Sequence, residues 1–267
     1  MKLRKNGGGI IFAFILLETK GGWFFMEAEL LVDKMDEVFV SNFMKNVVKS
    51  LQLFSQNTDP VLIQGETGTG KDTFANYIYM LYKEEPKFLH TINCYALNDI
   101  MLDNLVTSIL NQKFEKNTTL MLYFNDVSEL SLSAQNFLLR FLEGYSNKKN
   151  PLDVKIKLIS STTKSINELI VSNMFKEQLY YRISTQLIYI SPLRARTEDI
   201  MPLFRFFMNS FKCDFKLTTE VENMLVNYPW PGNMRELYNT VKQLATLNVT
   251  EIQKEFLPYP IIHYFNR

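Results

Sequence analysis

Residues 61–73 read Val61-Leu62-Ile63-Gln64-Gly65-Glu66-Thr67-Gly68-Thr69-Gly70-Lys71-Asp72-Thr73, and this stretch decides the fold. An apolar strand runs into a glycine-rich loop, which opens directly into a helical pattern. The spacing is that of a phosphate-binding P-loop, where glycines let backbone N–H groups converge on phosphate oxygens and the lysine reaches the β- and γ-phosphates. The candidate nucleotide-binding residues are Gly65, Glu66, Thr67, Gly68, Thr69, Gly70, Lys71, Asp72 and Thr73.

Buried strands and amphipathic helices alternate along the first two thirds of the chain. This alternation predicts an α/β fold with a five-stranded parallel sheet, whose ligand site lies at the carboxyl ends of the strands. The expected strands are Val61–Ile63, Phe88–Ile92, Leu120–Phe124, Ile156–Ile159 and Leu187–Ile190. The expected helices are Asn42–Phe54, Asp72–Tyr82, Asp99–Asn111, Ser133–Leu142 and Ile166–Tyr180.

The pattern changes after Glu198, where strands are expected to stop. Three helical segments follow at about 199–211, 218–227 and 233–246, which predicts a small α-helical lid subdomain. The expected division is an N-terminal extension (1–37), a nucleotide-binding α/β subdomain (38–192), the helical lid (193–250) and a C-terminal tail (251–267). For the tail, a docking segment and a packed C-terminus both remain open.

Composition limits the classes of function. A net charge of +1 gives no concentrated basic surface of the kind that autonomous DNA binding needs. Cys94 and Cys213 are too few for a disulfide framework or a metal site, which favours a reduced, cytoplasmic setting. Basic residues and a short apolar run within residues 1–22 have the layout of a signal peptide. The alternative is an extension upstream of a start at Met26, and the nucleotide chemistry favours it.

Five blocks, in order, resemble the AAA+ ATPase domain of sigma-54-dependent transcriptional activators. The resemblance covers about residues 38–246 and implies a P-loop AAA+ fold. The blocks are the P-loop with an acidic residue after its lysine, Phe88-Leu89-His90-Thr91-Ile92-Asn93-Cys94, Phe175-Lys176-Glu177-Gln178-Leu179-Tyr180-Tyr181-Arg182, Ser191-Pro192-Leu193-Arg194-Ala195-Arg196-Thr197-Glu198-Asp199-Ile200, and Tyr228-Pro229-Trp230-Pro231-Gly232-Asn233-Met234-Arg235-Glu236-Leu237.

The resemblance implies a division of roles around ATP and Mg²⁺. Arg235 corresponds to the sensor that contacts nucleotide phosphates from the lid. Arg182 and Lys176 correspond to two arginine fingers, which reach the ATP of a neighbouring subunit and stabilise charge on the transferring phosphoryl group. Such fingers imply that the chain partners itself in a ring.

Several residues depart from the family pattern. Asn125 replaces the magnesium-holding Asp, and Asp126 replaces the Glu that polarises water, so the expected metal residues, Asn125 and Asp126, form a weak Mg²⁺ site. Thr163 stands where a sensor Asn is usual, and Lys176 lacks the planar fork of arginine. Asp72 fits the family but differs from P-loop proteins in general, because it brings no hydroxyl to the metal. Together these changes predict ATP binding with slow or absent hydrolysis.

The segment Leu97–Thr119 lacks the Gly-Ala-Phe-Thr-Gly-Ala loop by which the family engages the sigma factor. No phosphoreceiver or DNA-binding module is expected at either end. Two functions therefore remain open, beside a third possibility, a decayed remnant that retains the fold. One is an ATP-dependent ring that acts on sigma-54 RNA polymerase, and the other is a hydrolysis-deficient regulator that modulates an intact activator. Neither is expected to bind a membrane.

Overall fold

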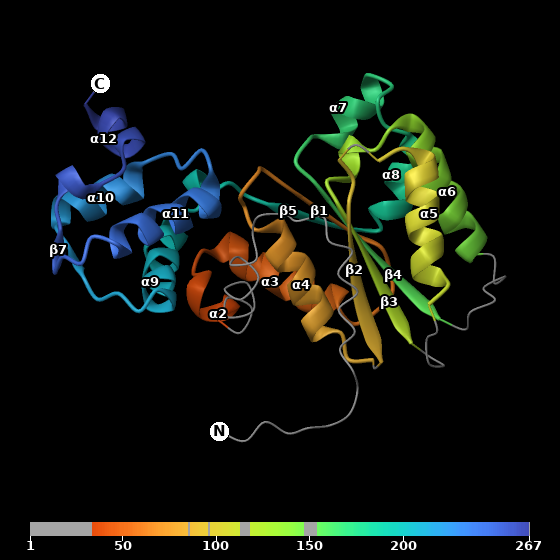
Figure 1. The fold of residues 1–267 in the computed structure, drawn as a ribbon, viewed down its shortest axis with the longest axis horizontal. Helices are drawn as coiled ribbons and strands as arrows, with labels where there is room; N and C mark the ends of the chain where they lie inside the picture. Colours follow the sequence, from red (N-terminus) through yellow and green to blue (C-terminus); the bar gives the residue numbers. More distant parts are fainter. Residues whose placement is uncertain (1–33, 85, 96, 113–117, 147–153, 267) are drawn as a thin grey trace.

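A computed structural model describes residues 34–266 except 85, 96, 113–117 and 147–153. Five parallel strands form one sheet, as the sequence predicts, and their order is β2-β3-β4-β1-β5 (Figure 1). The strands are β1 (Val61–Gly65), β2 (Lys87–Asn93), β3 (Thr119–Asn125), β4 (Lys155–Thr162) and β5 (Gln186–Ile190). Strand β1 lies between β4 and β5, so the P-loop leaves the sheet beside the carboxyl ends of both.

Helices cover both faces of the sheet (Figure 1). One face packs against α3 and α4, and the other packs against α5, α6 and α8, so that β3 and β4 are buried on both sides. The helices of this subdomain are α2 (Met35–Val38), α3 (Asn42–Phe54), α4 (Lys71–Leu81), α5 (Asp99–Leu110), α6 (Leu132–Ser146), α7 (Ile166–Val171) and α8 (Glu177–Ile183), with a 3₁₀ turn η1 (Val127–Glu129).

The single helix predicted over Ile166–Tyr180 is wrong, because the chain forms two helices there. Asn173 adopts a left-handed conformation with φ 56°, which asparagine tolerates better than most residues. The amides of Met174 and Phe175 both donate to the carbonyl of Leu169, and this turn places Phe175 in the core at 3% exposure. The apolar spacing continues across the turn, which explains the error.

The lid is mainly helical, but the expectation that strands stop at Glu198 is also wrong. Two short strands, β6 (Lys216–Leu217) and β7 (Glu251–Ile252), pair in parallel. The C-terminal segment packs on the lid, since Ile252, Leu257 and Ile261 are buried. The lid helices are α9 (Ile200–Ser210), α10 (Thr219–Asn227), α11 (Asn233–Ala245) and α12 (Tyr259–Phe265), with 3₁₀ turns η2 (Leu193–Ala195), η3 (Thr197–Asp199) and η4 (Lys254–Phe256).

The signal-peptide and extension interpretations of residues 1–22 lie outside the described residues. Across the residues that are described, no helix combines the length and apolar character that a membrane crossing requires. The continuous helix expected after Leu97 is present as α5.

Candidate nucleotide-binding site

Backbone geometry in the P-loop explains its glycines. Gly68 has φ 80° and Gly70 has φ 99°, a region that residues with a Cβ rarely adopt. Gly70 is the N-cap of α4, so the loop delivers the chain directly to the helix. The first N–H groups of a helix have no acceptor within it, and its dipole adds partial positive charge. The loop and helix therefore form an anion-binding cradle.

Lys71 is buried at the mouth of this cradle. Its ammonium donates to the carbonyls of Gly65 at 3.0 Å and Glu66 at 3.2 Å. Burial lowers the pKa of Lys71, while the charges of Asp126 and Asp72 act in the opposite direction. The cation therefore lies within the field of both carboxylates, in a position to exchange two carbonyl contacts for phosphate oxygens.

The lid closes directly onto the P-loop. A Cβ built on Gly68 would lie 2.2 Å from the carbonyl oxygen of Gly232. The amide of Arg235 donates to the carbonyl of Gly68 at 3.3 Å, and Nδ2 of Asn233 donates to that of Thr67 at 3.0 Å. Both Asn233 and Arg235 belong to the first turn of α11, so this helix touches the loop that would hold phosphate.

A second link between loop and lid is an ion pair that the sequence does not announce. Arg194 donates from both terminal nitrogens to the two carboxylate oxygens of Glu66, at 2.8 and 2.5 Å. Asn233 also donates to Glu66, at 3.3 Å. The hydrogen bond from Arg194 is the main reason that the pKa of Glu66 lies below its ordinary value. Glu66 therefore stays ionised and tied to the lid.

The lid also reaches the start of the described chain through buried polar groups. Asp199 accepts from the amides of Val40 and Ser41 at 2.8 and 2.7 Å, and from the Ser41 hydroxyl at 2.8 Å. Arg196 lies 3.7 Å from Asp199 and over the ring of Phe39, and burial lowers its pKa to about 10. This cluster fixes the base of the lid.

Hydroxyl groups organise the end of β3. The Tyr123 hydroxyl donates to Oδ1 of Asp72 at 2.6 Å and lies 3.0 Å from Oγ of Ser161. Ser161 in turn donates to Oδ1 of Asn125 at 3.1 Å and accepts from the amide of Asp126 at 3.1 Å. The network joins the P-loop helix to the two residues predicted to hold metal.

Asp126 combines an unusual backbone conformation with burial. Its φ is 54°, and the residue is 8% exposed. The Tyr95 hydroxyl donates to Oδ2 at 3.3 Å, whereas Oδ1 is buried and has no hydrogen-bond partner among the described residues. A buried carboxylate oxygen without a donor is costly, so this atom is available to a cation or a water molecule.

The other predicted site residues lie elsewhere. Thr163 follows β4, is half-buried, and makes no side-chain hydrogen bond to the described residues. Lys176 is the N-cap of α8, and its amide donates to Gln135. Arg182 lies in the last turn of α8, its side chain is 46% exposed, and it lies 3.8 Å from Glu143. Neither finger residue makes a described contact with the P-loop of its own chain.

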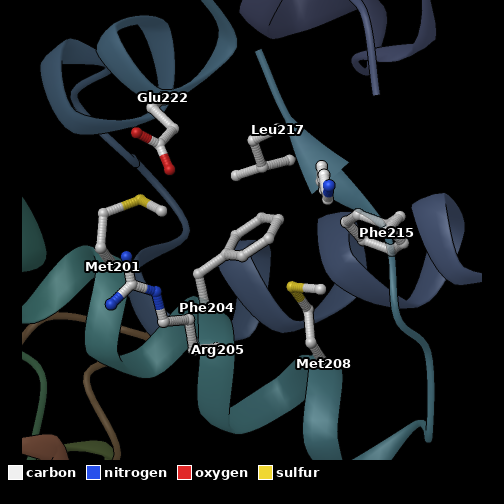
Figure 2. Close-up of a pocket in the computed structure, with 8 residues that line it drawn as sticks. Met201, Phe204, Arg205, Met208, Phe215, Leu217 and Glu222 are labelled. Carbon is white, nitrogen blue, oxygen red and sulfur yellow. The ribbon is translucent and has the colours of Figure 1, made fainter. Parts of the chain in front are cut away.

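A cavity of about 320 Å³ lies in the lid, away from the P-loop (Figure 2). None of its lining residues is among those predicted for the site. The cavity is lined by Met201, Phe204, Arg205, Met208, Phe215, Lys216, Leu217 and Glu222.

In the part of the chain that the structure describes, no cluster of three or more His, Cys, Asp or Glu could hold a metal.

Sequence reasoning missed Tyr95, Tyr123, Ser161, Arg194, Asn233 and the Asp199 cluster. Arg194, Asn233 and Asp199 do stand within the blocks that carry the family resemblance, which is the signal that was available. Tyr123 lies inside an apolar strand and offers no local signal. Its role depends on contacts with residues far away in the sequence.

Two family profiles match the chain. The Sigma-54 interaction domain matches residues 38–189, and the AAA+ ATPase lid domain matches residues 194–263. Solved structures agree with this fold. NtrX from Brucella abortus in complex with ADP has a TM-score of 0.72 at 22% identity over 89% of this chain and 59% of that one. The RuvB Holliday junction branch migration motor of Thermotoga maritima has a TM-score of 0.56 at 17% identity over 83% and 69%.

Curated relatives are transcriptional regulators. The HTH-type transcriptional regulatory protein TyrR of Salmonella typhimurium is 31% identical over 78% of this chain and 43% of its own length. A signal-transduction and transcriptional-control protein of Clostridium beijerinckii is 32% identical over 80% and 37%. The chain thus spans less than half the length of these two relatives. It belongs to the sigma-54 interaction domain family of AAA+ proteins found in bacterial transcriptional regulators.

Proposed function

We propose that this chain binds ATP at residues 65–73 and acts in the cytoplasm as one subunit of an AAA+ ring that controls sigma-54-type transcription. The observation that carries the proposal is the closed arrangement of P-loop and lid, in which Lys71, the α4 N-terminus and the first turn of α11 meet. Nucleotide binding also has support from NtrX of Brucella abortus, whose structure was determined in complex with ATP.

Each group has a defined task in this proposal. The α4 N-terminus and Lys71 bind phosphate oxygens, and Arg235 contacts them from the lid. The positive charge of Arg235 acts on Lys71, since Arg235 is among the groups that lower the pKa of Lys71. Asp126 orients the attacking water. A bound magnesium ion would neutralise phosphate charge beside the Asp126 carboxylate.

Arg182 and Lys176 act on the ATP of a neighbouring subunit. Both lie on α8 and away from their own P-loop, so they can stabilise transferring phosphate only in trans. The contact between Arg182 and Glu143 is long and exposed, and such pairs contribute little stability. Arg182 can therefore leave Glu143 for a phosphate at little cost.

Two observations favour the second function, a regulator that binds ATP but hydrolyses it poorly. Asn125 is neutral and its amide oxygen already accepts from Ser161. Asp126 is shorter than the glutamate that the family uses and is held by Tyr95. In this form the chain modulates an intact activator by joining its ring, and α5 takes the place of the sigma-factor loop.

ATP turnover measured against protein concentration tests the proposal. The decisive form mixes two inactive variants: Lys71→Ala keeps both fingers but lacks the phosphate-binding lysine, and Arg182→Ala keeps that lysine but lacks the Arg182 finger. We expect the mixture to recover turnover, because each Arg182→Ala site then faces an intact finger in some rings. Lys176→Gln, mixed in the same way, assigns the second finger.

The outcomes separate the two functions. Turnover that rises with concentration and recovers on mixing supports the active ring. ATP binding without turnover at any concentration supports the regulator. Absence of ATP binding in the wild-type protein contradicts both.

A further inference from the structure

Asp72 lies where a P-loop protein places its magnesium-holding side chain. It directly follows Lys71 as the second residue of α4. A Ser or Thr at this place holds magnesium through its hydroxyl in many such proteins. Asp72 supplies a carboxylate instead, and magnesium prefers charged oxygen ligands, of which one or two suffice beside phosphates.

Tyr123 fixes the orientation of this carboxylate. Its hydroxyl is buried within the sheet and donates to Oδ1 of Asp72 at 2.6 Å, a length typical of hydrogen bonds to ionised oxygens. Oδ2 of Asp72 makes no hydrogen bond to the described residues and is left as a ligand.

Asn125, by contrast, is poorly suited to hold metal. It carries no charge, and its amide oxygen already accepts from Ser161. The neighbouring Asp126 is more than nine-tenths buried, and its Oδ1 lacks a donor among the described residues. The Tyr123 hydroxyl that donates to Asp72 lies 3.0 Å from Oγ of Ser161, which accepts from the amide of Asp126. One hydrogen-bond network therefore joins Asp72 and Asp126 beside the P-loop.

We propose that Asp72 and Asp126 hold the magnesium of a bound nucleotide, that Asn125 does not, and that Tyr123 positions Asp72. The two metal-holding charges then lie in the first turn of α4 and directly after β3, and the last residue of β3 contributes none. This inference rests on the proposed ATP binding and replaces the sequence-based expectation that Asn125 and Asp126 form the Mg²⁺ site.

Binding of a fluorescent ATP analogue, with a methylanthraniloyl group on the ribose, tests the inference without relying on turnover. Affinity is measured in EDTA and across a magnesium titration, and Mn²⁺ paramagnetic resonance reports metal capture directly. For Asp72→Asn, we expect the magnesium needed for half-maximal enhancement to rise about tenfold or more, because a charged ligand is lost. Binding in EDTA should be unchanged or tighter, because a negative charge near the phosphates is removed.

Tyr123→Phe should raise the magnesium requirement by about three- to tenfold, with an unchanged melting curve as the check on folding. Asn125→Ala should shift it by less than about threefold. Asp103→Asn removes the same charge from the exposed face of α5 and serves as the matched control.

Each result has one meaning. Wild-type magnesium dependence in Asp72→Asn, or its loss in Asn125→Ala, overturns the inference. Wild-type protein that binds the analogue equally with and without magnesium also overturns it, while leaving ATP binding intact. Wild-type protein that binds no analogue under either condition contradicts the proposed function instead.

Discussion

Arg194 donates from both terminal nitrogens of its guanidinium to Glu66, and this ion pair connects the first 3₁₀ turn of the lid to the P-loop. Both side chains are partly exposed, at 46% and 40%, so the pair contributes little to global stability. Its consequence is local. Arg194 pairs with the negative charge of Glu66, which would otherwise lie unpaired beside bound phosphate. The same ion pair holds the lid against the P-loop.

We predict that Arg194→Ala weakens ATP binding by about three- to tenfold, because one lost charge-assisted contact is worth roughly 1 kcal/mol. The melting temperature should change by less than about 2 °C. Fluorescence titration and differential scanning fluorimetry measure the two quantities. Arg205→Ala removes an exposed arginine from α9 and is the matched control. Equal affinity in the two variants would show that the pair plays no part in binding.

Gly68→Ala tests the close approach of loop and lid. The new Cβ would lie 2.2 Å from the carbonyl oxygen of Gly232, and the backbone at this position has a φ of 80°. We expect a loss of about 1–3 kcal/mol in the free energy of unfolding, together with a strong loss of ATP binding. Gly144→Ala is the control, since that helical position is open and the change should stabilise α6 by up to about 1 kcal/mol. Urea unfolding distinguishes the two; a Gly68→Ala protein as stable as wild type would refute the contact.

The buried cluster at the base of the lid predicts a large effect. Asp199→Ala removes the acceptor for three donors and leaves Arg196 buried beside Phe39 without its carboxylate. We expect a loss of about 3–5 kcal/mol, because an uncompensated buried charge remains. Glu198→Ala, one residue away and exposed, should cost no more than about 0.5 kcal/mol. Similar unfolding midpoints for both variants would exclude the proposed role of Asp199.

Lys157 predicts a pH dependence of stability. It is fully buried in β4, donates to the carbonyls of Phe54, Asn57 and Asp59, and burial lowers its pKa from 10.5 to about 8. Between these values the unfolded chain binds more protons at this site than the folded one, so its contribution to the free energy of unfolding rises with pH.

Urea unfolding of the wild type and Lys157→Met from pH 7 to pH 10 measures this contribution. At pH 7 we expect Lys157→Met to lose at least about 2 kcal/mol, because three carbonyls lose their donor. The gap between the two proteins should widen as pH rises above about 8. A gap that stays constant would mean that Lys157 titrates as it does in the unfolded chain.

Local patterns were sufficient to predict the P-loop and the five strands. Gly68 and Gly70 stand at fixed spacing from Lys71, and the strands are runs of apolar residues, so neighbours in sequence carry the information. The break between α7 and α8 at Asn173 was not predicted, because the apolar spacing continues through it and a single left-handed residue does not change the hydrophobic period. Strand pairing of β6 with β7 escaped because each contributes only two residues.

The site could be predicted only in part, for a physical reason. The pair of Arg194 and Glu66 joins residues 128 positions apart, and that of Tyr123 and Asp72 joins residues 51 apart. A tyrosine in an apolar strand suits the core equally well with or without a polar partner. The substitution of Asn125 was visible in the sequence, whereas the contacts that make Asp72 a substitute ligand depend on the folded arrangement.

Equilibrium binding of ATP to the wild-type protein and to Lys71→Ala tests the central claim most directly. Isothermal titration in the presence of magnesium should give saturable binding with one site per chain for the wild type, and binding weakened by at least about tenfold for Lys71→Ala, because that variant loses the only P-loop cation. Failure of the wild-type protein to bind ATP, or equal binding by the two proteins, would contradict the assignment of residues 65–73 as a nucleotide site.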